Sequence, residues 1–342
     1  MKRIIFFLGV VLFISVINSC KNEDWSFPDF DYTTSYFPYQ YPVRTLVLGD
    51  YNFDNSRDNE LKFLISANMG GVYENKKDIF VNFEIDNTLI NNLYNLDGET
   101  PILPLPENYY TLSNSNKIII PKGEFYGNIE VQLSEEFLLD SLAVGVNYVI
   151  PLRIVSATTD SVLQGKSEIA NPDPRIADNW VIKPKNFTLF GIKFVNEYDG
   201  SYLLRGKSIV KDASDNIVET NVYRKTQIVN DEIVVTKTIS KDAISYTNAV
   251  RLQSGGSPGN FKMDISFDSD GNATITKMKG SLFEITGSAK FVKGGDEWGG
   301  ERRNVIYLDY QINDGTNTHF VNDTLVFRNK NVKFEQFTPM IK

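Results

Sequence analysis

The chain has 342 residues, with 43 acidic and 35 basic side chains, one histidine and a formal net charge of −8 at pH 7. This balance argues against nucleic-acid binding, which depends on clustered lysine and arginine. One histidine cannot supply a paired-histidine metal site and one cysteine cannot form an intrachain disulfide, so we expect neither a metal nor another cofactor.

The first twenty residues predict a lipoprotein signal peptide. Lys2 and Arg3 precede the apolar run Ile4–Ile17, and the small Ser19 stands directly before Cys20. The run is shorter than the roughly 20 apolar residues that span a bilayer. We therefore expect residues 1–19 to be removed and the thiol of Cys20 to be lipidated. The alternative is an ordinary signal peptide whose cleavage leaves a free cysteine.

The segment after Cys20 predicts where the anchored protein resides. Lys21-Asn22-Glu23-Asp24 resembles the export signal that sends lipoproteins of Bacteroidetes to the outer face of the outer membrane. An ordinary solvated linker is the alternative, because acidic residues are common in tethers. We expect residues 20–35 to tether a lipid-anchored protein to the outer membrane, facing the cell exterior.

Residues 36–160 predict an immunoglobulin-like β-sandwich. Apolar and polar residues alternate at period two, for example in Ile79–Ile85 and Asn128–Leu133, and turn residues separate the runs. Short helices are expected at Thr88–Leu93, after a possible cap at Asp86, and around Glu135–Leu139. Several short strands in this length favour a sandwich.

The regular pattern fails over residues 161–186, which contain Asn171-Pro172-Asp173-Pro174 and predict an interdomain linker. Strand patterns resume at Phe187 and continue to residue 342 with almost no helical segment. Consecutive hairpins favour an antiparallel meander barrel of lipocalin-like type, with a second sandwich as the alternative. The predicted fold class is therefore all-β, with the second domain at 187–342.

Six segments of the chain, in the expected order, resemble two-domain surface lipoproteins of Bacteroidetes that are encoded in polysaccharide-utilisation loci. They are Tyr36–Gly49, Gly70–Lys77, Leu105–Leu112, Tyr148–Ile154, Lys193–Gly200 and Asp323–Arg328. Similar N-terminal modules accompany some endo-β-N-acetylglucosaminidases as accessories. The resemblance implies a glycan-binding protein that works beside a starch-utilisation-type transporter, with an oligo- or polysaccharide as ligand.

Catalysis is not expected from these residues. A serine–histidine–acid triad would require His319 as its base. The simpler interpretation is that His319 occupies a strand position and forms a hydrogen bond with a neighbouring residue. Gly255-Gly256-Ser257-Pro258-Gly259 has the letters of a nucleophile elbow, but no helix can follow it. The acidic run Asp50–Glu60 lacks the turn glycine and the terminal glutamate of a calcium loop.

Binding through aromatic faces remains. The candidate residues are Trp298 and Arg302, in the glycine-rich run Gly294–Arg303, and Trp180 in the linker. The alternatives are that Trp298 covers the barrel end and that Trp180 packs between the domains. The aromatic cluster Tyr36–Tyr41 could form an exposed patch or a first strand that packs on the core. We expect a non-catalytic glycan-binding lipoprotein, or alternatively a surface adhesion or scaffold lipoprotein that binds no carbohydrate.

Overall fold

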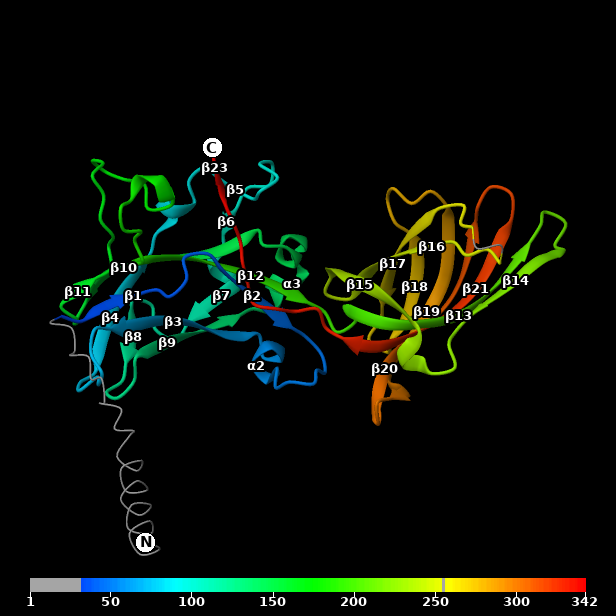
Figure 1. The fold of residues 1–342 in the computed structure, drawn as a ribbon, viewed down its shortest axis with the longest axis horizontal. Helices are drawn as coiled ribbons and strands as arrows, with labels where there is room; N and C mark the ends of the chain where they lie inside the picture. The colour runs from blue at the N-terminus through cyan, green and yellow to red at the C-terminus, as the bar shows by residue number, and fades with distance from the viewer. Residues whose placement is uncertain (1–31, 254–255) are drawn as a thin grey trace, which may run out of the picture.

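The period-two patterns form strands throughout the computed structural model, which describes residues 32–253 and 256–342. Two lobes lie side by side along the long axis (Figure 1). The first is a sandwich of two sheets and the second is a closed antiparallel barrel. The predicted all-β class is confirmed, and the choice left open for the second domain falls on the barrel. The predicted signal peptide and most of the predicted tether lie outside the described residues.

Two sheets build the first lobe by facing each other across one apolar core. Inward residues of β3 and β9 in one sheet meet those of β4 and β10 in the other, including Phe63, Ile129, Val81 and Leu152, all at most 2% exposed. The first sheet has the strand order β11 (Ser161–Val162), β1 (Thr34–Tyr36), β3 (Lys62–Gly70), β9 (Tyr126–Leu133), β7 (Tyr110–Leu112). The second has the order β22 (Glu335–Gln336), β2 (Pro42–Val47), β12 (Phe187–Val195), β10 (Tyr148–Ala157), β4 (Ile79–Ile85), β8 (Lys117–Ile120), with β6 (Leu103–Pro104) beside β10.

The helices of the described ranges are short. The Asp86 side chain accepts a hydrogen bond from the Thr88 amide and begins the 3₁₀ helix η1 (Asn87–Ile90), which is shorter than predicted. The expected helix at Glu135–Leu139 is confirmed as α3. The others are α2 (Ser56–Asn59), η2 (Glu107–Tyr109), η3 (Ser141–Val144), η4 (Ala177–Asn179) and η5 (Ile228–Asn230). No helix in these ranges has the length and apolarity needed to cross a membrane.

The barrel closes because β13 pairs with β21 as well as with β15. Its inward side chains are large and apolar, and Tyr202, Tyr246 and Met263 are fully buried. The strands are β13 (Gly200–Lys211), β14 (Ile217–Tyr223), β15 (Glu232–Ser240), β16 (Ala243–Ala249), β17 (Asn260–Phe267), β18 (Asn272–Lys277), β19 (Glu284–Trp298), β20 (Glu301–Asn313) and β21 (Thr318–Asn329). β14 is an additional strand that pairs with one end of β13.

The sheets place β12 in the first lobe, whereas the sequence analysis put residue 187 at the start of the second domain. β12 lies between β10 and β2, and Leu189, Ile192 and Phe194 are fully buried. The irregular residues before it form an excursion whose first strand, β11, pairs with β1. A proline-rich run therefore marks a loop within one sandwich here, because the chain returns from it to fill a central strand position.

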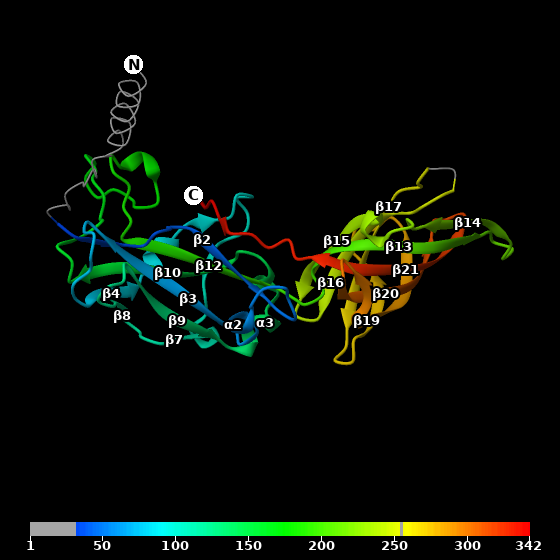
Figure 2. The same ribbon diagram turned by 60° about the horizontal axis from the view of Figure 1, so that its bottom comes forward.

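The chain also returns to the first lobe after the barrel. Residues that follow β21 run back along the molecule, visible as the red segment in Figures 1 and 2. β22 pairs with β2, and β23 (Met340–Ile341) pairs with β5 (Leu93–Tyr94). Besides β12, the first lobe thus includes two further strands that the sequence analysis assigned to the second domain, since short terminal strands carry too little pattern to reveal their partners.

Hydrogen bonds connect the two lobes where the chain passes from one to the other. The Asn196 side chain donates to the carbonyls of Ser240 and Ala243, each at 2.9 Å. Lys330, only 3% exposed, donates from Nζ to the Asn196 carbonyl at 2.6 Å. Burial lowers the pKa of Lys330 to about 8. The segment Lys193–Gly200, which carries part of the family resemblance, is therefore the junction.

Candidate functional site

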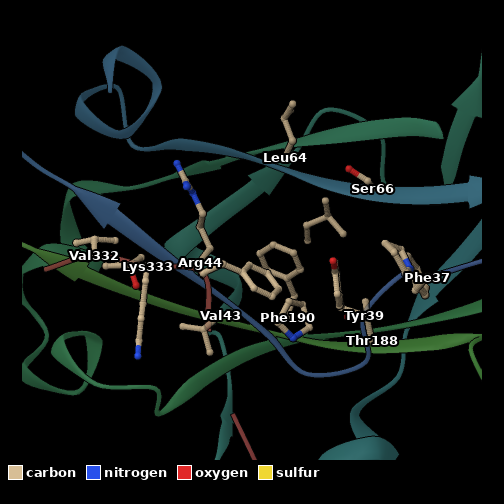
Figure 3. A pocket seen from close by; sticks show the side chains of 15 residues that line it. Phe37, Tyr39, Val43, Arg44, Leu64, Ser66, Thr188, Phe190, Val332 and Lys333 are labelled. Atoms are coloured by element: carbon tan, nitrogen blue, oxygen red, sulfur yellow. The ribbon is translucent and has the colours of Figure 1, made fainter. Parts of the chain in front are cut away.

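A cavity of about 440 Å³ opens on one side of the sandwich (Figure 3). It lies where the chain passes from β1 in one sheet to β2 in the other. The pairing of β1 with β3 covers only Asn68–Gly70 of β3, so Leu64–Ser66 have no strand neighbour on that side and line the cavity. The segment between β21 and β22, Val332–Phe334, closes another wall. We name this cavity the aromatic groove.

Aromatic side chains supply much of the groove's surface. The rings of Tyr39 and Phe334 have centroids 5.0 Å apart, and the two residues are 46% and 63% exposed. Phe190 lines the floor and stacks on the buried Phe63 at 5.5 Å. Phe37 is buried beside them. Rings fixed by a packed core offer a preformed apolar face to a ligand.

The polar groups of the groove are few and fixed in position. Thr188 is 1% exposed, lines the groove, and its hydroxyl has no hydrogen-bond partner among the described residues. Such buried groups are rare in native proteins, and each needs a partner such as water or a ligand. Arg44 lies toward one end, where it forms an ion pair with the buried Asp58. Asp58 also accepts a bond from the Val47 amide at 3.0 Å, which holds the pair in place.

Trp298, the first predicted binding residue, is half-buried against the outside of the barrel. Its indole N–H donates to the Phe327 carbonyl at 3.0 Å, and it packs on Leu203, Val305 and Val326. The Arg303 guanidinium lies 4.6 Å from the centre of its ring. The alternative to binding placed Trp298 over the barrel end, whereas the structure places its ring on the outer wall of the barrel.

Trp180 and Arg302 lie in different places, and the structure does not bring the three predicted residues together. Trp180 is half-buried after η4 in the first lobe, where its N–H donates to the Asp173 carbonyl at 2.7 Å. Arg302 is exposed and donates to the Gly294 carbonyl at 2.8 Å, within its own hairpin. None of the three lines the aromatic groove. Cys20 lies outside the described residues.

Sequence reasoning named neither residue of the groove's aromatic pair as a binding residue, although Tyr39 belongs to an aromatic cluster for which an exposed patch was one interpretation. The residues of the cluster Tyr36–Tyr41 differ in exposure, since Phe37 packs on the core whereas Tyr39 is 46% exposed, so each of the two alternatives holds for part of the cluster. Phe334 lies in Val332–Phe337, which the sequence pattern predicts as a closing strand of the second domain, whereas the structure has a strand only at Glu335–Gln336. Nothing in that local pattern connects Phe334 with Tyr39. Only the return of the chain after the barrel brings the two rings together.

The titratable groups of the described ranges form no group of three histidine, cysteine or acidic side chains suited to a metal ion. His319 is 1% exposed and bonds through Nε2 to Asp314 Oδ2 at 2.8 Å, so a neighbour partners one ring nitrogen, whereas Nδ1 is buried without a partner among the described residues. Within Asp50–Glu60, Asp54 accepts a bond from the Ser56 amide at the start of α2. Together with the Asp58 contacts, this gives the acidic run structural partners.

Comparison with known proteins gives two family matches and several solved structures. Residues 30–161 match a model described as an N-terminal domain, and residues 197–331 match DUF5627, a domain of unknown function. No curated protein matches the chain.

One solved structure is similar over nearly the whole chain. It is a protein of unknown function from Bacteroides ovatus, 38% identical, with a TM-score of 0.83, and the match covers 92% of this chain and all of that one. An auxiliary nutrient binding protein from Bacteroides thetaiotaomicron is 15% identical over 83% of this chain and 90% of its own, with a TM-score of 0.37. The second likeness is too distant to bear on function. With the first as its relative, the chain belongs to the same family as the Bacteroides ovatus protein.

Proposed function

We propose that the protein is a non-catalytic carbohydrate-binding lipoprotein that holds a glycan in the aromatic groove. The observation that carries this proposal is the pair Tyr39 and Phe334, two partly exposed rings beside a cavity with an unpartnered buried hydroxyl at Thr188. A sugar ring presents both kinds of surface that this groove complements. Its C–H groups pack on aromatic faces, and its hydroxyls pair with fixed polar groups.

The geometry suits a saccharide better than a purely apolar ligand. An apolar ligand would leave the Thr188 hydroxyl without a partner, which costs about 1–3 kcal/mol. The groove has a volume of about 440 Å³, and the exposed side chains of Tyr39 and Phe334 line it, so that sugar units bound there could continue into a longer chain in solvent. The nearby carboxylate Asp58 is held by Arg44 and by the Val47 amide, which gives it a structural role.

The test is a glycan array on the soluble chain that begins after Cys20, followed by calorimetry with the best polysaccharide. We expect Tyr39→Ala and Phe334→Ala each to weaken the affinity about tenfold, which corresponds to about 1.4 kcal/mol. The matched control is Phe53→Ala, because Phe53 is 74% exposed and does not line the groove. Equal affinities for the control and both groove variants would contradict the proposed site.

The surface location is part of the same proposal and rests on the sequence. Lipidation at Cys20 and export to the cell exterior would place the groove where polysaccharides are met. There the protein could pass oligosaccharides to a starch-utilisation-type transporter.

A further inference from the structure

The wall of the barrel has a side opening between β14 and the end of β16. On one edge, β13 pairs with β15 through Gly200–Leu204 and with β14 through Gly206–Lys211. The pairing of β16 with β15 ends at Tyr246. β14 and Thr247–Ala249 therefore face each other without a ladder of backbone hydrogen bonds, and the Asn221 side chain bridges the gap to the Arg251 carbonyl at 3.1 Å.

A cleft of about 520 Å³ occupies this opening, between Thr220–Tyr223 on one side and Ala249–Arg251 on the other. A small cavity shares Tyr223 and Arg251 with the cleft and continues into the barrel interior. Its volume of about 10 Å³ suits one water molecule or one hydroxyl group. The two spaces together form a cleft with a narrow floor, which we name the barrel cleft.

The floor of the barrel cleft is polar although it lies inside an apolar barrel. Asp323 is 3% exposed and accepts hydrogen bonds from the hydroxyls of Tyr310, at 2.8 Å, and Tyr223. Two further lining groups, Ser208 Oγ and His319 Nδ1, are buried and have no partner in the described part of the chain. Two such orphaned atoms beside one cavity indicate that something polar belongs there.

The mouth of the barrel cleft is balanced in charge. The Arg251 guanidinium lies 4.5 Å from the centre of the Tyr223 ring and pairs with Glu232 at 2.8 Å. Because the carboxyl groups of Glu232 and Asp323 lie near Arg251 and offset its positive charge, the cleft has no excess positive charge to attract an anion. It offers instead a flat ring–guanidinium stack, hydrogen-bond donors and hydrogen-bond acceptors.

We propose that the barrel cleft is a second binding site, for one neutral, hydroxyl-rich sugar unit. One hydroxyl of the sugar reaches the floor and pairs with Ser208, His319 or Asp323, while the ring rests beside Tyr223 and Arg251. This site is in the other lobe from the aromatic groove, and its residues are different. The proposal therefore stands or fails independently of the proposed function of the groove.

His319 is the sole histidine of the chain, so its imidazole reports on this floor without interference. The experiment follows the imidazole ¹⁵N signals of the ¹⁵N-labelled soluble chain at constant pH during titration with glucose, N-acetylglucosamine or glucuronate. We expect at least one neutral sugar to shift the Nδ1 signal saturably. Arg251→Ala should reduce the affinity at least tenfold, whereas Arg328→Ala, an exposed arginine on β21 outside the cleft, should not.

Three results would overturn the proposal. The first is the absence of any saturable shift with both neutral sugars, and the second is a shift that persists with the same affinity in Arg251→Ala. The third is a preference for glucuronate, which would indicate an anion site. The sugar-free His319 spectrum of each variant checks that the barrel is folded, and Ser208→Ala provides a second variant on the floor. Failure of calorimetry at the aromatic groove leaves this readout unaffected.

Discussion

At the scale of single residues, Thr188 separates stability from binding. Its hydroxyl is buried without a partner, so Thr188→Val removes an unsatisfied polar group and keeps the shape of the side chain. We expect the free energy of unfolding to remain equal or to rise by about 1 kcal/mol, while glycan affinity falls. Urea denaturation and calorimetry measure the two quantities. Thr188→Ser retains the hydroxyl and should retain affinity, so a loss of affinity in both variants would argue for packing instead.

Asp323 predicts a pH dependence of barrel stability. Burial raises its pKa from 3.8 to about 6, although the Tyr223 and Tyr310 hydroxyls oppose the rise. A raised pKa means that the folded state favours the protonated form. The stability from this group is therefore complete only well below pH 4 and is lost as the pH rises through 6. At about 1.4 kcal/mol per pKa unit, the loss is about 3 kcal/mol.

The variant Asp323→Asn tests this prediction because the other titrating groups cancel in the comparison. The difference in unfolding free energy, variant minus wild type, should increase by about 2 kcal/mol between pH 4 and pH 7.5, because the carboxyl is already partly deprotonated in the unfolded state at pH 4. Urea denaturation at a series of pH values measures it. A difference that stays constant over this range would show that Asp323 titrates normally.

At the scale of elements, the β19–β20 hairpin folds back on the barrel through Trp298. The indole covers Leu203, Val305 and Val326 and donates to the Phe327 carbonyl. We expect Trp298→Ala to destabilise the barrel by about 2–4 kcal/mol, somewhat less than for a fully buried tryptophan, without changing affinity at the aromatic groove. Thermal unfolding and calorimetry would show this. Unchanged stability with weakened binding would return Trp298 to the role that the sequence suggested.

The strands were predictable from the sequence wherever side chains alternate between a core and solvent. Phe261–Phe267 is an example, since its inward positions Phe261, Met263 and Ile265 are buried. Which strands pair with each other was harder to predict from the sequence. The residues of β12 are apolar on both faces, so their pattern indicates a central strand without naming its sheet, and β22 has only two residues.

The aromatic groove could be predicted only in part, for the same reason. The aromatic run that contains Tyr39 is visible locally. The roles of its partner Phe334 and of the Thr188 hydroxyl could not be predicted, because only the fold brings these three distant segments together at one edge of the sandwich. The sequence instead predicted Trp298 as a binding residue, because it stands in a glycine-rich run. The conformational freedom of such a run also allows Trp298 to pack on the outer wall of the barrel.

At the scale of the whole molecule, the proposed attachment to a membrane would depend on the thiol of Cys20. We expect Cys20→Ser to abolish labelling by a radioactive fatty acid and to release the protein from the membrane fraction, because the acyl chains provide the anchoring energy. Proteinase treatment of intact cells should digest the wild-type protein. Persistent membrane association of the serine variant would contradict anchoring through this residue.

The position of β22 and β23 has a consequence for biogenesis. The first lobe contains residues 34–195 together with 335–341, so its sheets lack two members until the entire barrel has emerged from the ribosome. Domains usually fold one after another from the N-terminus during synthesis. Here the first lobe can complete its sheets only after the barrel segment has been synthesised. A chain that stops after the barrel would leave the edge of β2 unpaired and the Tyr39 ring without Phe334, and this edge could then pair with other chains.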